Sequence, residues 1–225
     1  MSKNPSDKKY WLDWTIACGI GEFIGIAVAA GVGFLVLGSI GESQTTGYRI
    51  LVIVIMMLAG IIEGLVTGFF QWLVLRRKLL SMKTRNWLIP TALGAATAWA
   101  LGMLPSVFFL PEVSTSNNVE PSGLQIVLLA TVSGLILGAI FGIFQWLELR
   151  RHVDKASRWV LANSSGWVIG LAIIYLGASI PSAETSLTIV ILIGAISGLL
   201  AGFAVGAVTG LCLIQLRIKT MAGSQ

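Results

Sequence analysis

The chain has 225 residues, of which 56% are hydrophobic and only 11% are charged, and its mean hydropathy is +0.87. Soluble domains carry about 25% charged residues, whereas apolar runs longer than about 18 residues identify membrane spans. The composition therefore predicts an all-α integral membrane protein, built as one membrane domain over residues 1–225, and it leaves no room for a separate soluble domain.

We predict six membrane-spanning helices, joined by polar links that carry Pro, Gly, Lys or Arg. Their approximate ranges are 12–39, 48–76, 86–108, 122–149, 158–180 and 186–216. The longest external loop contains Pro111, Asn117, Asn118 and Pro121. The first apolar run is too long for the core of a signal peptide and has no cleavage-like site, so we expect it to be retained.

The Lys and Arg residues predict that both termini face the cytoplasm. With the N-terminus inside, fourteen of the fifteen cations fall on the inner side and only Arg49 on the outer side. An excess of cations marks cytoplasmic segments, and the outer loops carry Glu42, Glu112, Glu120 and Glu184 instead. The net charge of +5 is thus a topology signal. We expect contact with anionic headgroups on the cytoplasmic side and no nucleic acid partner.

One stretch of the sequence occurs twice. Gly60 to Arg77 recurs as Gly134 to Arg151, and eleven of the eighteen positions are identical at a constant offset of 74. Such self-similarity indicates a duplicated unit. Glycine recurs every fourth residue in both copies and again in the sixth span, at Gly60, Gly64, Gly68, Gly134, Gly138, Gly142, Gly198, Gly202 and Gly206. A glycine stripe lets another helix backbone approach closely, so we interpret these residues as helix-packing positions.

The odd-numbered spans repeat as well. Trp14, Trp87 and Trp159 stand at the cytoplasmic start of these spans, each followed seven residues later by glycine. The chain therefore reads as three tandem helix pairs, at approximately 12–78, 86–152 and 158–219. We expect a pseudo-threefold axis along the membrane normal, with spans 2, 4 and 6 as an inner triad and spans 1, 3 and 5 outside.

Two acids interrupt the apolar pattern, Glu22 in the first span and Glu63 in the second. A charge at the bilayer centre costs at least about 2.5–3.5 kcal/mol, so such residues are functional candidates. At 1.5 Å per residue they lie roughly 15 and 20 Å from the cytoplasmic surface. Three interpretations are open: neutral acids bonded across a helix contact, a proton or cation site, and pairing with a partner subunit.

The duplicated stretch ends in a polar and aromatic motif at the predicted cytoplasmic mouth. Its residues are Gln71, Trp72 and Arg76 in one copy and Gln145, Trp146 and Arg150 in the other. The third pair has Thr209-Gly210 where the others have Gln-Trp. One interpretation is an aromatic belt whose amides satisfy helix-end carbonyls, with headgroup-anchoring arginines. The alternatives are a polar ring that gates a cytoplasmic cavity, a docking surface, and an arginine site for an anionic ligand.

Signatures of catalysis are missing from the sequence. It has no Walker loop, no H-E-x-x-H and no nucleophile elbow. Cys18 and Cys212 fall within apolar runs, so we expect no catalytic residue, no metal site and no cofactor.

The sequence favours a non-catalytic accessory or assembly subunit of a membrane complex, with other membrane subunits as candidate partners. The alternative is a small transporter or solute-binding component that uses Glu22 and Glu63 as a proton or cation site. We expect the membrane to be a bacterial plasma membrane, or else a thylakoid membrane.

Overall fold

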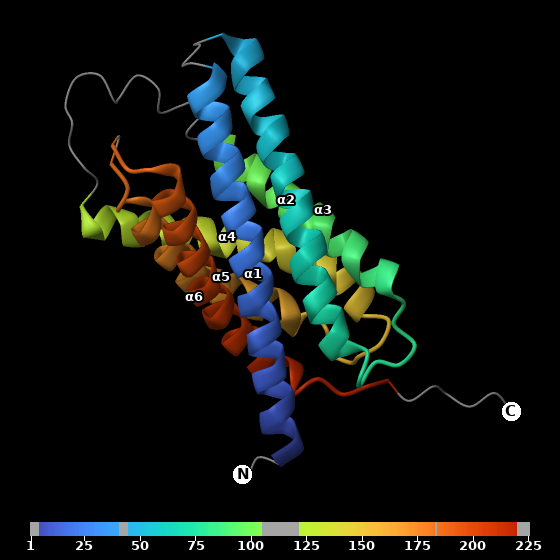
Figure 1. Cartoon of the computed structure of the whole chain (residues 1–225). Helices are drawn as coiled ribbons and strands as arrows, with labels where there is room; N and C mark the ends of the chain where they lie inside the picture. The colour runs from blue at the N-terminus through green and yellow to red at the C-terminus, as the bar shows by residue number, and fades with distance from the viewer. Residues whose placement is uncertain (1–4, 41–44, 105–121, 183, 220–225) are drawn as a thin grey trace, which may run out of the picture.

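The computed structural model describes residues 5–40, 45–104, 122–182 and 184–219 (Figure 1). The described chain forms six α-helices and no strand, only an isolated bridge between Val153 and Ile218. The helices are α1 (Pro5–Ile40), α2 (Thr46–Leu75), α3 (Thr84–Leu104), α4 (Gly123–Leu149), α5 (Arg158–Ala178) and α6 (Leu187–Leu213). All six are long and apolar enough to cross a membrane. The prediction of a multi-pass, all-helical membrane protein is confirmed.

The helix bounds differ from the predicted ones mainly at two ends. Helix α1 begins at Pro5, seven residues before the predicted start at residue 12, with Asp7 in its first turn. Proline is favoured in the first helical turn, and an acid there complements the helix dipole. Helix α6 ends at Leu213, three residues before the predicted end at residue 216.

Several predicted features lie outside the described residues. They are the last four residues of the predicted third span (105–108), the external loop residues Pro111, Asn117, Asn118 and Pro121, and the external acids Glu42, Glu112 and Glu120.

Helices α2, α4 and α6 begin in the same way. The side chains of Thr45, Ser122 and Ser186 accept hydrogen bonds from backbone N–H groups three residues further on. At α4 the Gln125 side chain also bonds back to the Ser122 backbone, which completes a capping box. Hydroxyl caps satisfy N–H groups that have no partner within the helix.

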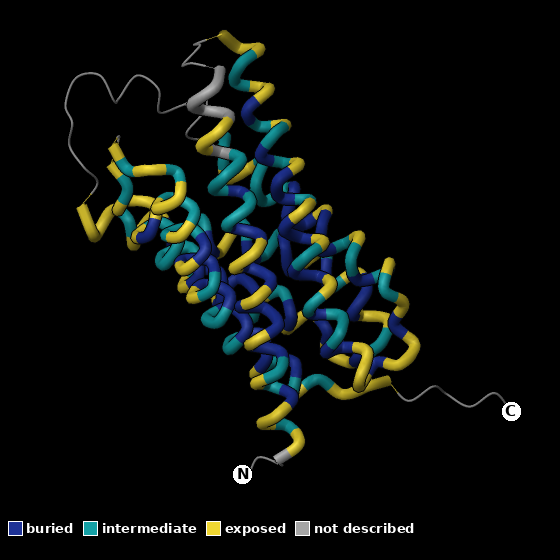
Figure 2. The backbone as a smooth tube through the Cα atoms, viewed as in Figure 1, coloured by how far each residue is buried: buried dark blue, intermediate teal, exposed yellow. Residues whose placement is uncertain are grey.

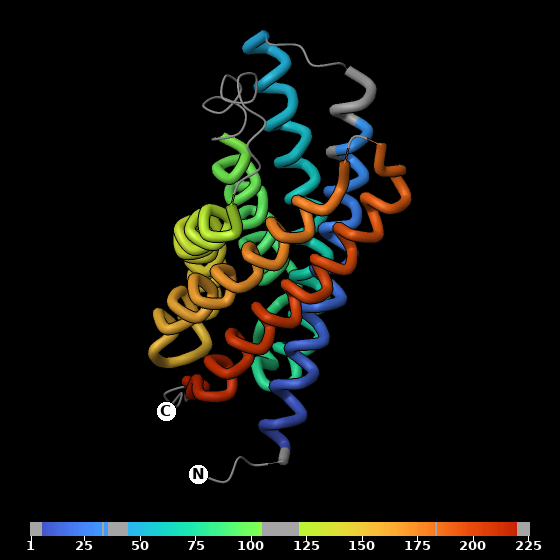
Figure 3. Tube along the Cα trace, turned by 90° about the vertical axis from the view of Figure 1, so that its left-hand side faces the viewer, coloured from blue at the N-terminus to red at the C-terminus, as the bar shows by residue number. Residues whose placement is uncertain are grey.

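The six helices are arranged as a closed ring (Figures 1 and 3). Within the described residues each helix packs against its neighbours in the chain, and α1 packs against α6, which is the most extensive contact of all. Within the described residues, the backbones of α2, α4 and α6 do not come close to one another. The expected inner triad of striped helices is therefore wrong.

The glycine stripes face the odd-numbered helices, which explains this arrangement. A Cβ on Gly64 would lie 2.6 Å from the Ala92 Cα of α3, and one on Gly138 would lie 2.8 Å from the Ser164 Cα of α5. On α6, a Cβ on Gly202 would lie 2.8 Å from a backbone Cα of α1. The other predicted packing glycines of each stripe meet the same partner helix. Each stripe thus joins its helix to the next odd helix around the ring, where backbones approach closely.

Both ends of the described chain lie at one end of the molecule (Figures 1 and 3). There Lys78 Nζ lies 3.1 Å from the Asp7 carboxylate, and the Lys219 backbone N–H donates to the His152 carbonyl at 2.9 Å. These contacts bring the α2–α3 link to the start of the chain and the α4–α5 link to its end. We call this the terminal end. Buried residues continue along the helices toward it, while the opposite end is mainly half-buried or exposed (Figure 2).

Candidate functional site

Three tryptophans meet inside the ring near the terminal end. Trp14 of α1, Trp87 of α3 and Trp159 of α5 are completely buried. The Trp159 ring packs edge-on against both others, with centroid distances of 5.6 Å to Trp14 and 6.3 Å to Trp87. The repeated Trp positions noted in the sequence are therefore one cluster and not three separate membrane anchors.

Each of these indoles donates a hydrogen bond to a polar side chain on an even-numbered helix. Trp87 Nε1 donates to Gln71 Oε1 at 3.2 Å, and Trp159 Nε1 donates to Gln145 Oε1 at 3.0 Å. Trp14 Nε1 donates to Thr209 Oγ1 at 2.9 Å. Thr209 stands where the third helix pair lacks the Gln-Trp motif, so the residue type differs there but the bond to tryptophan is made.

The two glutamines also bond to each other. Gln145 Nε2 donates to Gln71 Oε1 at 3.0 Å and to Thr91 Oγ1 at 3.2 Å, and Gln71 Nε2 donates to Cys18 Sγ at 3.5 Å. No described hydrogen bond joins either amide to a helix-end carbonyl, so the belt interpretation does not fit Gln71 and Gln145. Gln71, Gln145, Thr91 and Cys18, together with the three tryptophans and Thr209, fill the ring interior at this end, and we call these eight residues the tryptophan–glutamine plug.

The other four residues of the predicted mouth lie at the rim of the plug. The Arg76 guanidinium lies over the Trp72 ring at 4.9 Å, and the Arg150 guanidinium lies over Trp146 at 4.7 Å. Trp72 Nε1 also donates to the Met82 carbonyl at 3.3 Å. Both arginines are exposed. The six predicted mouth residues thus separate into a buried polar pair and two cation–π pairs, each formed by an exposed arginine over a half-buried tryptophan.

The two acids are brought together deeper in the ring. Glu22 is 3% exposed and Glu63 is 4% exposed, and their carboxyl groups face each other. Thr67 Oγ1 lies 3.4 Å from Glu22 Oε1 as a donor, and Trp99 Nε1 donates to Glu63 Oε2 at 2.6 Å. Glu22 Oε2 is buried without a hydrogen-bond partner. Two carboxylates in contact in a low-dielectric interior repel each other strongly, so the pair holds at least one proton.

Small residues make room for both acids, but in different places. Glu63 lies against Gly25, where a Cβ would be 2.4 Å from its Cγ. The Cβ of Glu22 lies in the contact between α1 and α6, because a Cβ built on Gly202 would be 2.8 Å from it. The Glu22 side chain therefore starts beside α6, and its carboxyl reaches Thr67 and Glu63 of α2 inside the ring.

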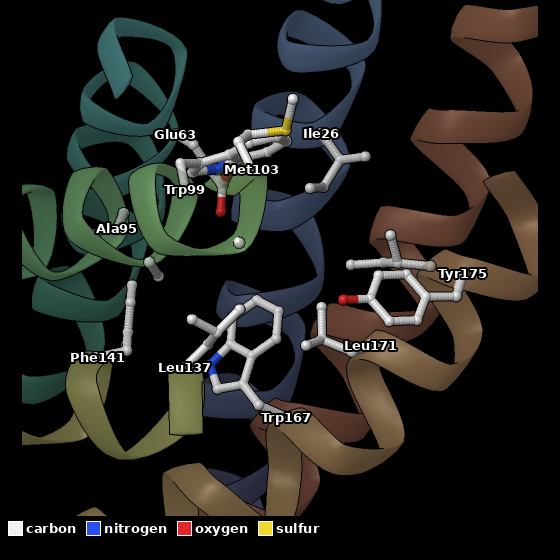
Figure 4. A pocket seen from close by; sticks show the side chains of 13 residues that line it. Ile26, Glu63, Ala95, Trp99, Met103, Leu137, Phe141, Trp167, Leu171 and Tyr175 are labelled. Atoms are coloured by element: carbon white, nitrogen blue, oxygen red, sulfur yellow. The ribbon is translucent and has the colours of Figure 1, made fainter. Parts of the chain in front are cut away.

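A cavity of about 180 Å³ adjoins Glu63 (Figure 4). We call it the inner chamber. Its walls come from α1 to α5, and Glu63 is the only acid among the described residues that line it. Figure 4 shows Trp99 and Met103 beside Glu63, with Trp167 and Tyr175 facing them. Glu22 is not part of this wall.

A second cavity, of about 520 Å³, lies next to the first. Ile26, Trp99, Met103 and Ile174 line both, so the two spaces adjoin. The second cavity extends to Pro181 in the α5–α6 link, at the end of the ring opposite the terminal end. We call it the outer chamber.

The inner chamber contains polar groups that the sequence did not single out as functional. Trp167 is 8% exposed, and its Nε1–H is buried without a partner. The Tyr175 hydroxyl projects toward the same space (Figure 4). Trp167 occupies the position in the third helix pair that corresponds to Glu22 in the first. That correspondence was the one feature of the sequence that could have marked Trp167 as a functional candidate, since aromatic residues in apolar helices are otherwise ordinary packing residues.

His152 lies in a polar cluster at the terminal end. Its Nε2 lies 3.0 Å from the buried Glu148 carboxylate, and its Nδ1 lies 3.3 Å from Ser81 Oγ. Asn86 Nδ2 donates to the same Glu148 at 3.2 Å, and Arg151 pairs with it at 3.3 Å. The cluster joins the α2–α3 and α4–α5 links. Within the described residues no group of three His, Cys, Asp or Glu side chains could hold a metal ion, and both cysteines are free.

Comparison with protein-family models, curated proteins and solved structures finds no match for this chain. The proposals below rest on its own residues.

Proposed function

We propose that this protein is a solute-binding or transport component of the membrane, with Glu63 and Glu22 as its proton or cation site. The observation that carries the proposal is the inner chamber, which has Glu63 as its only acidic lining residue. The sequence favoured a non-catalytic accessory or assembly subunit. The interior space beside one acid now supports the alternative more strongly.

The energetics of burial support a ligand at this position. A carboxyl inside a membrane protein is costly unless it is paired or hydrogen-bonded. An acid retained only for helix packing gains nothing from empty space beside it, and Glu22 lines neither of the two cavities. Glu63 combines a buried carboxyl with a cavity, and this combination is typical of a binding pocket with a few polar groups among apolar walls.

The contacts around the ring support a pseudo-threefold arrangement of three helix pairs, with its axis along the membrane normal. Gly21, Gly94 and Gly166 contact Thr67, Phe141 and Val205, which occupy corresponding positions in α2, α4 and α6. The three indole bonds of the plug follow the same pattern. We propose that the terminal end is cytoplasmic, because the α2–α3 and α4–α5 links there carry seven of the fifteen cations, whereas the predicted external segments carry only Arg49. A bacterial plasma membrane or a thylakoid membrane would fit this topology.

The closed plug supports the proposal that a solute reaches the chambers only from the external side. The outer chamber reaches the end opposite the termini, whereas the buried plug separates the inner chamber from the terminal end. The protein would then receive its solute from the external side, and any release to the cytoplasm would require the plug to open.

Thiol labelling from each side tests this access. In a chain with Cys18→Ser and Cys212→Ser, we expect Met103→Cys, at the junction of the chambers, to react with a small membrane-impermeant reagent added outside. Val74→Cys, buried beside the plug, is expected to stay unreactive from both sides. Lys83→Cys, on the α2–α3 link, is the topology control and should react only from the cytoplasmic side. Reaction of Met103→Cys only from the cytoplasmic side, or from neither side, would contradict the proposal.

The plug also favours a second function, the non-catalytic accessory subunit. Its buried hydrogen bonds close one end of the ring, as in a protein that does not conduct a solute. The exposed Arg76 and Arg150 could then contact anionic headgroups or another membrane subunit. Purification from native membranes followed by mass spectrometry distinguishes the two functions. A stoichiometric partner subunit supports the accessory role, and a monodisperse protein that isolates alone counts against it.

A further inference from the structure

We infer that the inner chamber binds a hydrophobic organic monocation, of the quaternary ammonium type with an aryl or alkyl tail. This inference rests on the proposed function, because it names the class of solute for the same cavity. It follows from three properties of the chamber: the charge of its walls, their aromatic content and its size.

The charge of the chamber calls for a cation. Among the described residues that line the chamber, Glu63 is the only one with an ionisable acidic or basic side chain other than the Tyr175 phenol, and none is Lys, Arg or His. Its carboxyl accepts a hydrogen bond from the Trp99 indole, which is neutral, and also faces the Glu22 carboxyl. An ionised Glu63 would therefore lack a counter-ion within the chamber, and a positively charged ligand would supply it.

The walls favour an organic cation over an inorganic one. Trp99, Phe141, Trp167 and Tyr175 all line the chamber, and aromatic rings attract quaternary ammonium groups through their π electrons. Phe141 packs edge-on against Trp167 at 6.0 Å, which holds that indole in place. A metal cation such as Ca²⁺ needs about six to eight oxygen ligands, which these walls do not provide.

The size of the chamber sets the size of the ligand. A dry cavity of about 150 Å³ in another protein holds one benzene molecule, and the inner chamber measures about 180 Å³. It therefore suits a trimethylammonium or similar head group. The adjoining outer chamber, of about 520 Å³ with mainly apolar walls, suits an aryl or alkyl tail.

Binding would exchange the cation for a proton. When both acids are protonated in the empty chamber, a monocation beside Glu63 favours its ionised form, so the Glu63 proton leaves as the cation enters and Glu22 keeps its proton. The titratable groups that face Glu63 are Glu22 on α1 and Tyr175 on α5, while the chamber residues of α3 and α4 include none. Cation binding should therefore strengthen as pH rises, by up to about tenfold per pH unit for one released proton.

A matched pair of ligands tests the inference. Benzyltrimethylammonium carries the positive charge, and neopentylbenzene is its neutral analogue of the same shape. Both are titrated against the purified full chain in non-ionic detergent at pH 8, by calorimetry and by tryptophan fluorescence. We expect the cation to bind at least tenfold more tightly. Glu63→Gln should remove this preference and leave the affinity for the neutral analogue unchanged, whereas Glu184→Gln, in an exposed link, should change neither affinity.

Two further variants keep the test decisive. Glu63→Asp retains the charge and should retain the preference for the cation. It therefore still tests the role of the charge if Glu63→Gln does not fold. Ala98→Leu narrows the inner chamber and should weaken the binding of both ligands. An unchanged affinity for the cation in this variant would place its binding site elsewhere and overturn the inference. Equal affinities of the unsubstituted chain for the two ligands would also overturn it while leaving a solute-binding cavity. If neither ligand binds and Met103→Cys is unreactive from outside, the proposed function fails as well.

Discussion

Gly134→Ala is expected to destabilise the protein by at least about 2 kcal/mol, within the range for overpacked interiors. A Cβ at this position would lie 2.4 Å from the Val168 Cα, 2.5 Å from its backbone nitrogen and 2.7 Å from the Trp167 carbonyl oxygen. All three atoms belong to the α5 backbone, so no side-chain rotation relieves the collision. Helices α4 and α5 would have to separate, and the contact between them would be lost.

The matched control is Gly123→Ala at the start of the same helix. No atom lies within 4 Å of a Cβ built there. Alanine at an unhindered helical position stabilises by roughly 0.5–1 kcal/mol relative to glycine, so this variant should be neutral or slightly more stable. Gly68→Ala should lie between the two, because its Cβ would meet only the Thr91 side chain, at 3.2 Å or more.

Unfolding of the detergent-solubilised variants, followed by tryptophan fluorescence, measures this series. The expected order of stability is Gly123→Ala, then Gly68→Ala, then Gly134→Ala. Equal stability of Gly134→Ala and Gly123→Ala would show that the α4 and α5 backbones do not meet at this point. That result would argue against the ring arrangement.

Gln145→Met is the second change with a large expected effect, a loss of about 2–4 kcal/mol. Methionine nearly fills the glutamine volume, so the loss comes from hydrogen bonds and not from a cavity. The buried Trp159 N–H would have no acceptor, and an orphaned buried donor costs about 1–3 kcal/mol. The two bonds donated to Gln71 and Thr91 are lost too. Interhelical bonds in membranes contribute about 0.6 kcal/mol each on average.

Gln215→Met is the control for this change, because Gln215 lies exposed just after α6 and should tolerate methionine within about 0.5 kcal/mol. A double-mutant cycle with Trp159→Phe gives the sharper measurement. The combined loss should be smaller than the sum of the two single losses, because both variants break the same bond. Strict additivity would contradict a direct bond between the two side chains.

Loosening the plug has a second expected consequence. Val74→Cys, unreactive in the intact protein, should gain reactivity from the cytoplasmic side when it is combined with Gln145→Met. A Val74→Cys thiol that stays protected in the destabilised variant would mean that packing closes this end without help from the glutamine bonds.

The sequence by itself determined the number, order and type of the helices. An apolar segment of sufficient length must satisfy its backbone hydrogen bonds internally in lipid, so the hydropathy of each span is enough to predict its helix. The two interior acids were also identifiable from the sequence, because a buried charge is rare and stands out against an apolar background. The recurrence of glycine every fourth residue indicated faces where backbones approach closely.

Only the tertiary structure decided which faces meet. A stripe shows that close approach is sterically allowed but does not specify a partner, and so the inner triad was a reasonable and wrong expectation. The partner is set by complementary backbone surfaces on the odd-numbered helices, such as Ala92 facing Gly64 and Ser164 facing Gly138. These lie on other segments and carry no distinctive local pattern.

The candidate site likewise has a part that the sequence predicted and a part that only the tertiary structure shows. The sequence placed Glu22 and Glu63 at similar depth, yet it could not show that Glu63 lines a cavity while Glu22 does not. Nor could it bring Trp99, Trp167 and Tyr175 around that cavity, because each is an ordinary aromatic residue within its own helix. Spans are local properties of a chain, whereas a cavity is the space that several distant segments leave unfilled, and so it exists only once the ring has closed.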